Sequence, residues 1–291
     1  MESKNRSVWI IVVAIVALVG CCCLLACSTA GIGLLARLSP DCCGDWGSKA
    51  EEEGEPQFQR VTESFSSGQA PTLWISSFAG GVTVLGDDVE EISVTATKKA
   101  RRRSDLDRIQ ITMTEREGGL EIKIRNPSRV TNASVSLEVT VPAATHLEAD
   151  LAAGAVVVEG LTGGLRAASA AGAIVLMDVS GGIDAKTAAG VVSARNASGP
   201  ISLESAAGII EYQGVPSGEC HFEASAGSIA VDLPAEPNLA VDLQATIGAV
   251  DAACDVEGTS TRRKLKGVIG TGTEGTLRAR ATVGDIDLIC R

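Results

Sequence analysis

Few side chains in this sequence could carry out acid–base chemistry. The 291 residues include two His and one Tyr, so a catalytic reaction would have to depend on carboxylates, Lys or Cys. Four carboxylates recur at related positions of a glycine-centred repeat, namely Asp184, Glu204, Glu223 and Asp242. Parallel β-helical enzymes use such carboxylates to cleave polysaccharides. Basic side chains occupy corresponding positions of the same repeat: Arg166, Lys186, Arg278 and Arg280. We therefore interpret these residues as a solvated face of mixed charge and expect no enzymatic activity.

The residues that commonly bind metals, cofactors or nucleic acids are also sparse. His146 and His221 stand apart without the partner spacing of a zinc site. The Gly-Gly-x-Gly-x-Asp motif of calcium-binding β-rolls is absent, although paired glycines recur. The formal charge of −11 and the pI near 4.8 argue against a general nucleic-acid binder. We expect no catalytic residue, no cofactor, no metal and no nucleic-acid partner.

One pair of cysteines suggests a disulfide. Cys254 and Cys290 each lie six residues after a repeat glycine, so both should point inward at the same place along the repeat. If residues 255–276 bulge out as a loop, the two units are neighbours and the cysteines are close enough to bond. If that stretch is itself a degenerate unit, the cysteines are too far apart. The sequence leaves both alternatives open.

A repeat centred on glycine is the element that would position these side chains. Each unit has apolar residues seven and usually five positions before the glycine, small residues directly before it, and apolar residues two and four positions after it. The unit recurs eight times, at Gly80, Gly154, Gly172, Gly190, Gly208, Gly227, Gly248 and Gly284. The alternation of apolar and polar positions predicts strands with one buried face.

The repeat indicates an all-β fold. Spacings of about 18 residues and the similarity of successive units favour a parallel β-solenoid, in which coil stacks on coil and tight glycine corners join short strands. An antiparallel sandwich is the competing interpretation, because it also uses short strands at regular spacing. A narrow coil also accounts for the few aromatic residues, which make up 3% of the chain.

Residues 85–146 interrupt the repeat between its first and second units. Longer alternating stretches predict strands at 91–100, 108–117, 119–125 and 134–141, with a hairpin turn at Gly118-Gly119. The basic run from Lys98 to Arg103 lies in a loop here, followed by a single helical turn over 104–107. We interpret the run as a solvated loop beside a sheet edge; a site for anionic polymers or lipid headgroups is the alternative.

The N-terminal part has a different character. Val8–Ala36 holds no charge over 29 residues, which predicts one transmembrane helix within an anchor at 1–37. Lys4 and Arg6 precede it, so we expect a single-pass membrane protein with a cytoplasmic N-terminus and an extracytoplasmic C-terminal domain. A signal peptide followed by lipidation of Cys21 is the alternative. We expect a flexible acidic stalk over 38–70 and the repeat domain over 71–291.

The small-small-Gly-apolar-x-apolar units, the double-strand region and the N-terminal span resemble the bacterial β-strand-repeat family of putative adhesins, a domain family of unknown function. The resemblance covers about residue 73 to the C-terminus. It implies a β-solenoid placed outside the cytoplasm, with roles in adhesion or envelope stress, and it supplies no catalytic residues.

Two functional hypotheses follow. The first is a non-enzymatic adhesion, binding or structural module of the cell envelope. The second is a regulatory membrane protein that senses envelope stress and acts through a membrane partner. The expected partners are the membrane, through a span or a lipid anchor, and a cell-wall polymer or a membrane protein.

Overall fold

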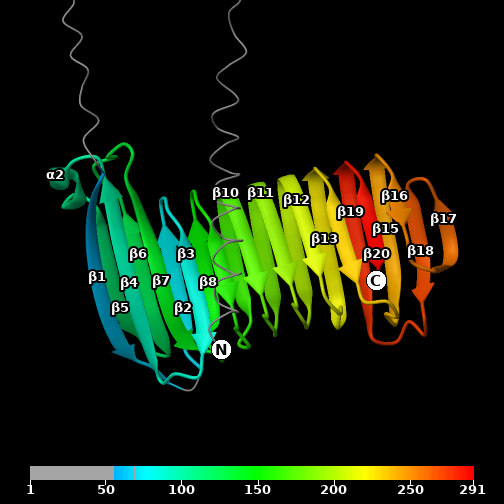
Figure 1. The fold of residues 1–291 in the computed structure, drawn as a ribbon, viewed down its shortest axis with the longest axis horizontal. Helices are drawn as coiled ribbons and strands as arrows, with labels where there is room; N and C mark the ends of the chain where they lie inside the picture. Colours follow the sequence, from blue (N-terminus) through cyan, green and yellow to red (C-terminus); the bar gives the residue numbers. More distant parts are fainter. Residues whose placement is uncertain (1–55, 69) are drawn as a thin grey trace, which may run out of the picture. The chain divides into compact units, whose positions relative to one another are not determined.

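The computed structural model describes residues 56–68 and 70–291. This part of the chain is almost entirely β-structure, with one short helix, α2 (Arg103–Leu106). Figure 1 shows its strands side by side along one axis. Parallel pairs form the middle of the sheet and antiparallel pairs form its two ends, so the sheet is mixed.

Each repeat unit forms one coil, made of a first strand, a glycine corner and a second strand. In three coils a single 13-residue strand runs through the corner: β10 (Leu165–Met177), β11 (Ile183–Arg195) and β12 (Ile201–Gln213). In the other coils the two strands are separate. These pairs are β2 (Thr72–Ser77) with β3 (Val82–Asp87), β8 (His146–Leu151) with β9 (Val156–Glu159), β13 (Gly218–Ala226) with β14 (Ile229–Leu233), β15 (Leu239–Ile247) with β16 (Val250–Ala252), and β19 (Gly275–Val283) with β20 (Ile286–Cys290).

The coils stack in parallel and in register. Leu165 pairs with Ile183, and Ile183 pairs with Ile201, so neighbouring positions are 18 residues apart in the sequence. First strands pair with first strands and second strands with second strands, which produces two layers joined at the corners. We call the layer of first strands the first face and the layer of second strands the second face.

The order of coils in space departs from the order in the sequence at the C-terminal end. β13 and β14 pair with β19 and β20, which in turn pair with β15 and β16. The last coil is therefore inserted between the two that precede it. Within residues 255–276, for which we considered a loop or a degenerate coil, β17 (Glu257–Thr261) and β18 (Lys264–Ile269) form a hairpin, and the last two residues begin β19. β18 pairs antiparallel with β15.

The N-terminal end is built from the region between the first two coils. Its strands are β4 (Glu91–Ala100), β5 (Gln110–Arg116), β6 (Gly119–Arg125) and β7 (Ser134–Pro142), close to the predicted ranges. β6 extends the first face beside β2, and β7 extends the second face beside β3. We expected residues 38–70 to form a flexible stalk, but Gln57–Ser66 forms the strand β1, which pairs with β4 along ten residues.

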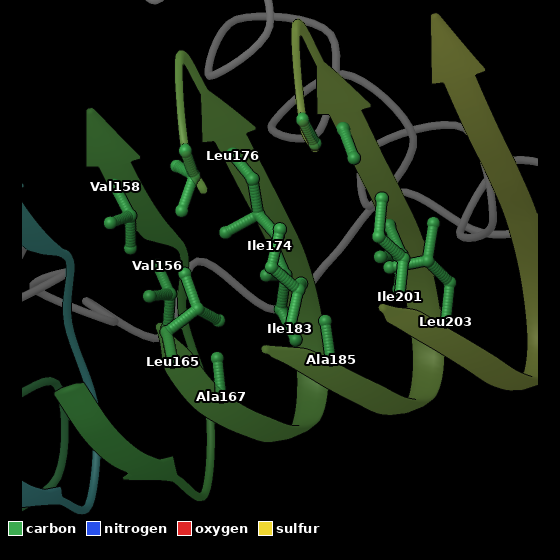
Figure 2. Packing of buried hydrophobic residues seen from close by; sticks show 14 of the residues in the cluster. Val156, Val158, Leu165, Ala167, Ile174, Leu176, Ile183, Ala185, Ile201 and Leu203 are labelled. Atoms are coloured by element: carbon green, nitrogen blue, oxygen red, sulfur yellow. The ribbon is translucent and has the colours of Figure 1, made fainter. Parts of the chain in front are cut away.

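The core lies between the two faces. Figure 2 shows side chains of successive coils, among them Leu165, Ile183 and Ile201, pointing into this space. Almost every apolar repeat position is buried, as the period-two alternation predicts. Ala252 is the exception: it lies on β16, the outermost strand of the second face, which has a neighbouring strand on one side.

The glycine corners require glycine for a steric reason. Gly190 has φ +142°, and a Cβ built on it would overlap the carbonyl oxygen of Gly172 in the coil below. Each corner glycine stacks on the corner of the adjacent coil in the same way, except that Gly80 stacks on Val135 of β7. The repeat glycine is therefore fixed by the close approach of neighbouring backbones.

The predicted fold class and localisation need correction. We predicted a transmembrane helix within 1–37 and a single-pass membrane protein. Across 56–68 and 70–291 no helix has the length and apolarity needed to span a membrane, since α2 has four residues. The predicted span and Cys21 lie outside the described residues, as does the predicted boundary at 37/38. The mixed sheet is a second correction to the predicted parallel solenoid with an N-terminal hairpin region. The N-terminal hairpin is present as β5 and β6, but the C-terminal end also has antiparallel pairs, β15 with β18 and β17 with β18.

Candidate functional site

The outer surface of the first face carries a regular array of polar side chains. On each first strand the residues six and four positions before the corner glycine alternate with the buried ones, so they point outward. Three successive coils show the arrangement: Arg166 with Ala168, Asp184 with Lys186, and Ser202 with Glu204. Side chains at equivalent positions of adjacent coils are separated by about 4.8 Å, the spacing of strands in a sheet.

Lys186 is the centre of a ladder of ion pairs on this surface. Its Nζ lies 3.0 Å from Oε1 of Glu204 and 3.5 Å from Oδ1 of Asp184. Arg166 extends the ladder, with Nε 3.9 Å from Oδ2 of Asp184. The hydrogen bond to Glu204, more than the nearby charge of Asp184, raises the pKa of Lys186 above its ordinary value. The ladder thus joins three coils through alternating charges.

An open groove of about 660 Å³ runs along the first face beside the glycine corners; we call it the corner groove. Its small side chains come from equivalent positions of successive coils, namely Ala152, Ala170, Ala188 and Ala206. Lys186 and Glu204 of the ladder lie along it. Small residues before each corner glycine were predicted from the repeat as a steric requirement. Their alignment also leaves an open channel across the coils.

A second open groove, of about 610 Å³, lies on the same face and contains both histidines of the chain; we call it the histidine groove. His146 has Nε2 4.0 Å from Oε1 of Glu148, and His221 has Nε2 3.4 Å from Oε2 of Glu223. Asp184 and Arg166 also line this groove, so the ladder borders both grooves. The sequence suggested that the two histidines are isolated, and each instead neighbours one glutamate.

The predicted carboxylates do not converge on one point. Lys186 connects Asp184 and Glu204, and Glu223 is the partner of Glu204 on the next coil. Asp242 lies on β15, beyond the inserted coil, where its cross-strand partners are Arg278 and Lys266. In the part of the chain that the structure describes, no group of three His, Cys, Asp or Glu could hold a metal ion. The arrangement offers charged groups and hydrogen-bonding groups along several coils.

A column of hydroxyl groups was missed at the sequence level. Ser77, Ser169, Thr187 and Ser205 each lie three residues before a corner glycine and are buried. Ser169 Oγ donates to the carbonyl oxygen of Gly154 at 3.5 Å, while the hydroxyl oxygens of Ser77, Thr187 and Ser205 have no hydrogen-bond partner among the described residues. The recurring Ser/Thr-x-x-Gly spacing was the available signal.

The cysteines and glycines singled out in the sequence belong to the scaffold. Cys254 and Cys290 form a disulfide with a Cα–Cα distance of 5.2 Å. The eight corner glycines all have positive φ. Cys220 occupies a core position, and burial raises the pKa of its thiol to about 11. These residues belong to the scaffold, whereas the side chains of the ladder and the two grooves lie on its surface.

Comparison with known proteins gives structural neighbours alone. No family model and no curated protein matches the chain. A putative cell adhesion protein from Clostridium sporogenes is 12% identical, with a TM-score of 0.38 over 81% of this chain and 100% of that chain. A putative adhesin from Bacteroides fragilis is 11% identical, with a TM-score of 0.36 over 79% of this chain and 96% of that chain.

A putative adhesin from Parabacteroides distasonis is 9% identical, with a TM-score of 0.29 over 79% of this chain and 97% of that chain. At these TM-scores the neighbours support no inference about what this chain binds. These three solved structures are of a putative cell adhesion protein and two putative adhesins.

Proposed function

We propose that this chain is a non-enzymatic binding module of the adhesion type, and that the first face of its coils is the binding surface. The observation that supports this most directly is the Lys186 ladder lying between two open grooves on one face. Sites for small molecules are enclosed and mainly apolar, whereas these grooves are open and bordered by charges. An extended ligand would contact several coils at once.

The ligand class that fits this surface is a hydrated polymer such as a cell-wall polysaccharide. Its hydroxyl groups can both donate and accept hydrogen bonds, and the ladder offers donors at Lys186 and acceptors at Asp184 and Glu204. The alanines of the corner groove leave room for a chain to lie against the strands. Because outward positions recur at the strand spacing, a longer polymer would contact more coils, and affinity should rise with polymer length.

One aromatic residue on the same face adds to this surface. Trp74 is the first-coil equivalent of the outward residues Glu148 and Arg166, and Arg116 lies over its ring at 5.8 Å from the centroid. Arg116 in turn pairs with Glu121 at 2.7 Å. The ring is therefore held in place by a cation–π contact at the N-terminal end of the first face.

The proposal is tested by blocking the corner groove without changing the scaffold. Ala188 is exposed on the groove, so Ala188→Arg places a long charged side chain in it. Ala235→Arg, at an exposed position after β14, is the control with the same change of size and charge. Binding to purified cell-wall polysaccharides of graded length is measured by calorimetry. We expect A188R to weaken binding at least tenfold and A235R to leave it within about twofold.

Two results would contradict the proposal. Equal binding by A188R and the unmodified chain would exclude the corner groove as the contact surface. Hydrolysis of the polymer during the measurement would exclude a non-enzymatic role. The regulatory hypothesis depends on residues 1–37, and nothing in the described part of the chain supports it.

A further inference from the structure

The inserted last coil changes the charge of the first face. β19 lies between β13 and β15, so Arg278 comes to lie beside His221, and Arg280 beside Glu223. Figure 1 shows β13, β19, β15 and β18 side by side toward the C-terminal end. Had the coils kept their sequence order, β15 would follow β13, and its outward residues at these two positions are acidic or uncharged. The insertion therefore brings two arginines next to the coils that carry the ladder.

Two lysines complete a group of exposed cations on this part of the first face. We call the group the basic patch, and its members are Arg278 and Arg280 on β19 with Lys264 and Lys266 on β18. β15 runs between these two strands. Lys266 and Arg278 are both cross-strand partners of Asp242. Lys264 and Arg280 are both cross-strand partners of Gln244. Each lysine is thus two strand spacings, about 10 Å, from an arginine.

The charges of the basic patch do not balance. Its four positive side chains surround one carboxylate, that of Asp242, which leaves a net charge of +3 on the outward side of three adjacent strands. Arg278 has one ion pair, with Glu219 at 4.0 Å, and both side chains are largely exposed. The other three basic side chains form no ion pair with any residue of 56–68 and 70–291. Because an exposed pair at this distance contributes little, the patch keeps its positive charge.

The two strands that flank the basic patch also belong to the described chain. On β17 the residues opposite the two lysines are Thr259 and Thr261, which carry no charge. On β13 the residues opposite the two arginines are His221 and Glu223. Of these four neighbours one is acidic, and Glu223 also lies 3.4 Å from the His221 ring nitrogen Nε2. The flanking strands therefore do not cancel the charge of the patch.

Both grooves of the first face lead to the basic patch. In the spatial order of the coils, β13 is the last strand that lines either groove, through Glu223 in the corner groove and His221 in the histidine groove. The next strand is β19, which carries the two arginines. The ladder has two charges of each sign, whereas the patch has a net charge of +3. A polymer that follows either groove along the coils therefore reaches a surface with uncompensated positive charge.

We infer that the basic patch selects acidic polysaccharides by binding their carboxylate groups, while the grooves hold the hydroxyl-bearing chain. The assignment rests on the proposed function of the first face and names the class of polymer that this face takes. Guanidinium groups match carboxylate oxygens in a fork geometry, and lysine ammonium groups add charge without a fixed geometry. A neutral polysaccharide would contact the grooves alone and bind more weakly. Because the patch is exposed, salt should weaken the binding of the acidic polymer more than that of the neutral one.

The experiment compares two forms of one polymer, polygalacturonate and its methyl ester, which share a backbone and differ in charge. Binding to the full chain is measured by calorimetry in 50 and 300 mM NaCl without calcium. The test variant is K264Q/R280Q. The matched control is K99Q/R195Q, which removes one lysine and one arginine from exposed positions of β4 and β11 outside the first face.

The unmodified chain should bind polygalacturonate at least about fivefold more tightly than the ester in 50 mM NaCl, and this preference should decrease in 300 mM NaCl. K264Q/R280Q should weaken binding of polygalacturonate at least about fivefold and leave binding of the ester within about twofold. K99Q/R195Q should leave the affinity for both polymers within about twofold.

Four results would overturn the inference. These are no binding of polygalacturonate, equal affinity of the unmodified chain for the two polymers, equal weakening by both double variants, and binding of inorganic polyphosphate as tight as that of polygalacturonate. The last result would assign the basic patch to polyanions in general.

Failure of this inference is distinguishable from failure of the proposed function. If A188R binds neither polymer while K264Q/R280Q binds both as the unmodified chain does, the corner groove is the contact surface and the selection of acidic polymers is wrong. If K264Q/R280Q loses polygalacturonate while A188R binds it normally, the basic patch binds the polymer and the corner groove does not.

Discussion

Cys254 and Cys290 are 36 residues apart in the sequence, and their Cα atoms are 5.2 Å apart in the fold. They meet because the last coil lies directly beside the coil of β15 and β16, with Val250 opposite Ile286 and Ala252 opposite Leu288. The bond closes a loop that contains the β17–β18 hairpin. It therefore fixes the C-terminal coil in its inserted position between β13–β14 and β15–β16.

Removing this disulfide should lower stability. Replacing both cysteines by serine releases a loop of this length in the unfolded chain, which should reduce the free energy of unfolding by about 2–4 kcal/mol. Urea denaturation of C254S/C290S and of the unmodified chain measures the difference. A reducing agent should destabilise the unmodified chain and have no effect on the double variant. Equal stability of the two proteins would show that the insertion does not depend on the bond.

The stacked corners predict a severe effect of one added methyl group. In G190A the new Cβ would overlap the Gly172 carbonyl oxygen at a backbone φ of +142°, so the two coils would have to separate. We expect a loss of at least about 3 kcal/mol of unfolding free energy, measured by urea denaturation.

Gly182 provides the matched control for this substitution. It directly precedes β11, the strand that contains Gly190, and a Cβ built on it meets no atom within 4 Å. G182A should therefore change stability by less than about 1 kcal/mol. Similar losses in G190A and G182A would mean that glycine content, and not the close approach of the corners, determines stability.

The repeat allowed the coils to be predicted because each position combines two independent signals. Leu165, Ile183 and Ile201 share a spacing of 18 residues and an apolar character, and they became cross-strand neighbours. Cys254 and Cys290 each lie six residues after a corner glycine, which likewise predicted that they occupy equivalent positions of their coils. Local alternation was also sufficient for the strands between the first two coils.

The order of the coils and the ladder could not be derived in the same way. Equivalent strands have interchangeable backbones, so nothing in the periodicity indicates that β19 pairs with both β13 and β15. We predicted a stalk for residues 38–70 because this stretch is polar and acidic and contains few large apolar residues. Gln57–Ser66 is largely exposed, and it forms a strand through its pairing with β4. The ion pairs of Lys186 depend on rotamers of long side chains, which residue type and position leave undetermined.

Tyr212 should contribute a single buried hydrogen bond to the core. Its hydroxyl donates to the carbonyl oxygen of Ala197 at 3.0 Å, and its ring packs against Phe222 with centroids 5.2 Å apart. Y212F keeps the ring pair and leaves the carbonyl of the buried Ala197 without this donor. We expect a loss of about 1–2 kcal/mol in the free energy of unfolding. Unchanged stability in urea denaturation would mean that water replaces the hydroxyl.

The thiol of Cys220 should be unreactive in the folded protein. Burial in the core penalises the thiolate and raises the pKa of this thiol to about 11, so about one molecule in a thousand carries the thiolate at pH 8. Iodoacetamide labelling at pH 8, followed by peptide mapping, should modify the Cys220 peptide much more slowly in native protein than in urea. Rapid native labelling would contradict the packing of this core position.

The same raised pKa predicts how stability depends on pH. The unfolded chain releases the Cys220 proton near its ordinary pKa of 9.0, whereas the folded chain retains it until about pH 11. The contribution to folding is therefore fully present below pH 9 and is lost as the pH rises from about 9 to 11. C220A removes this titration at the cost of a small cavity. Its stability should be lower at pH 8 and should fall less between pH 9 and 11, as measured by urea denaturation at each pH.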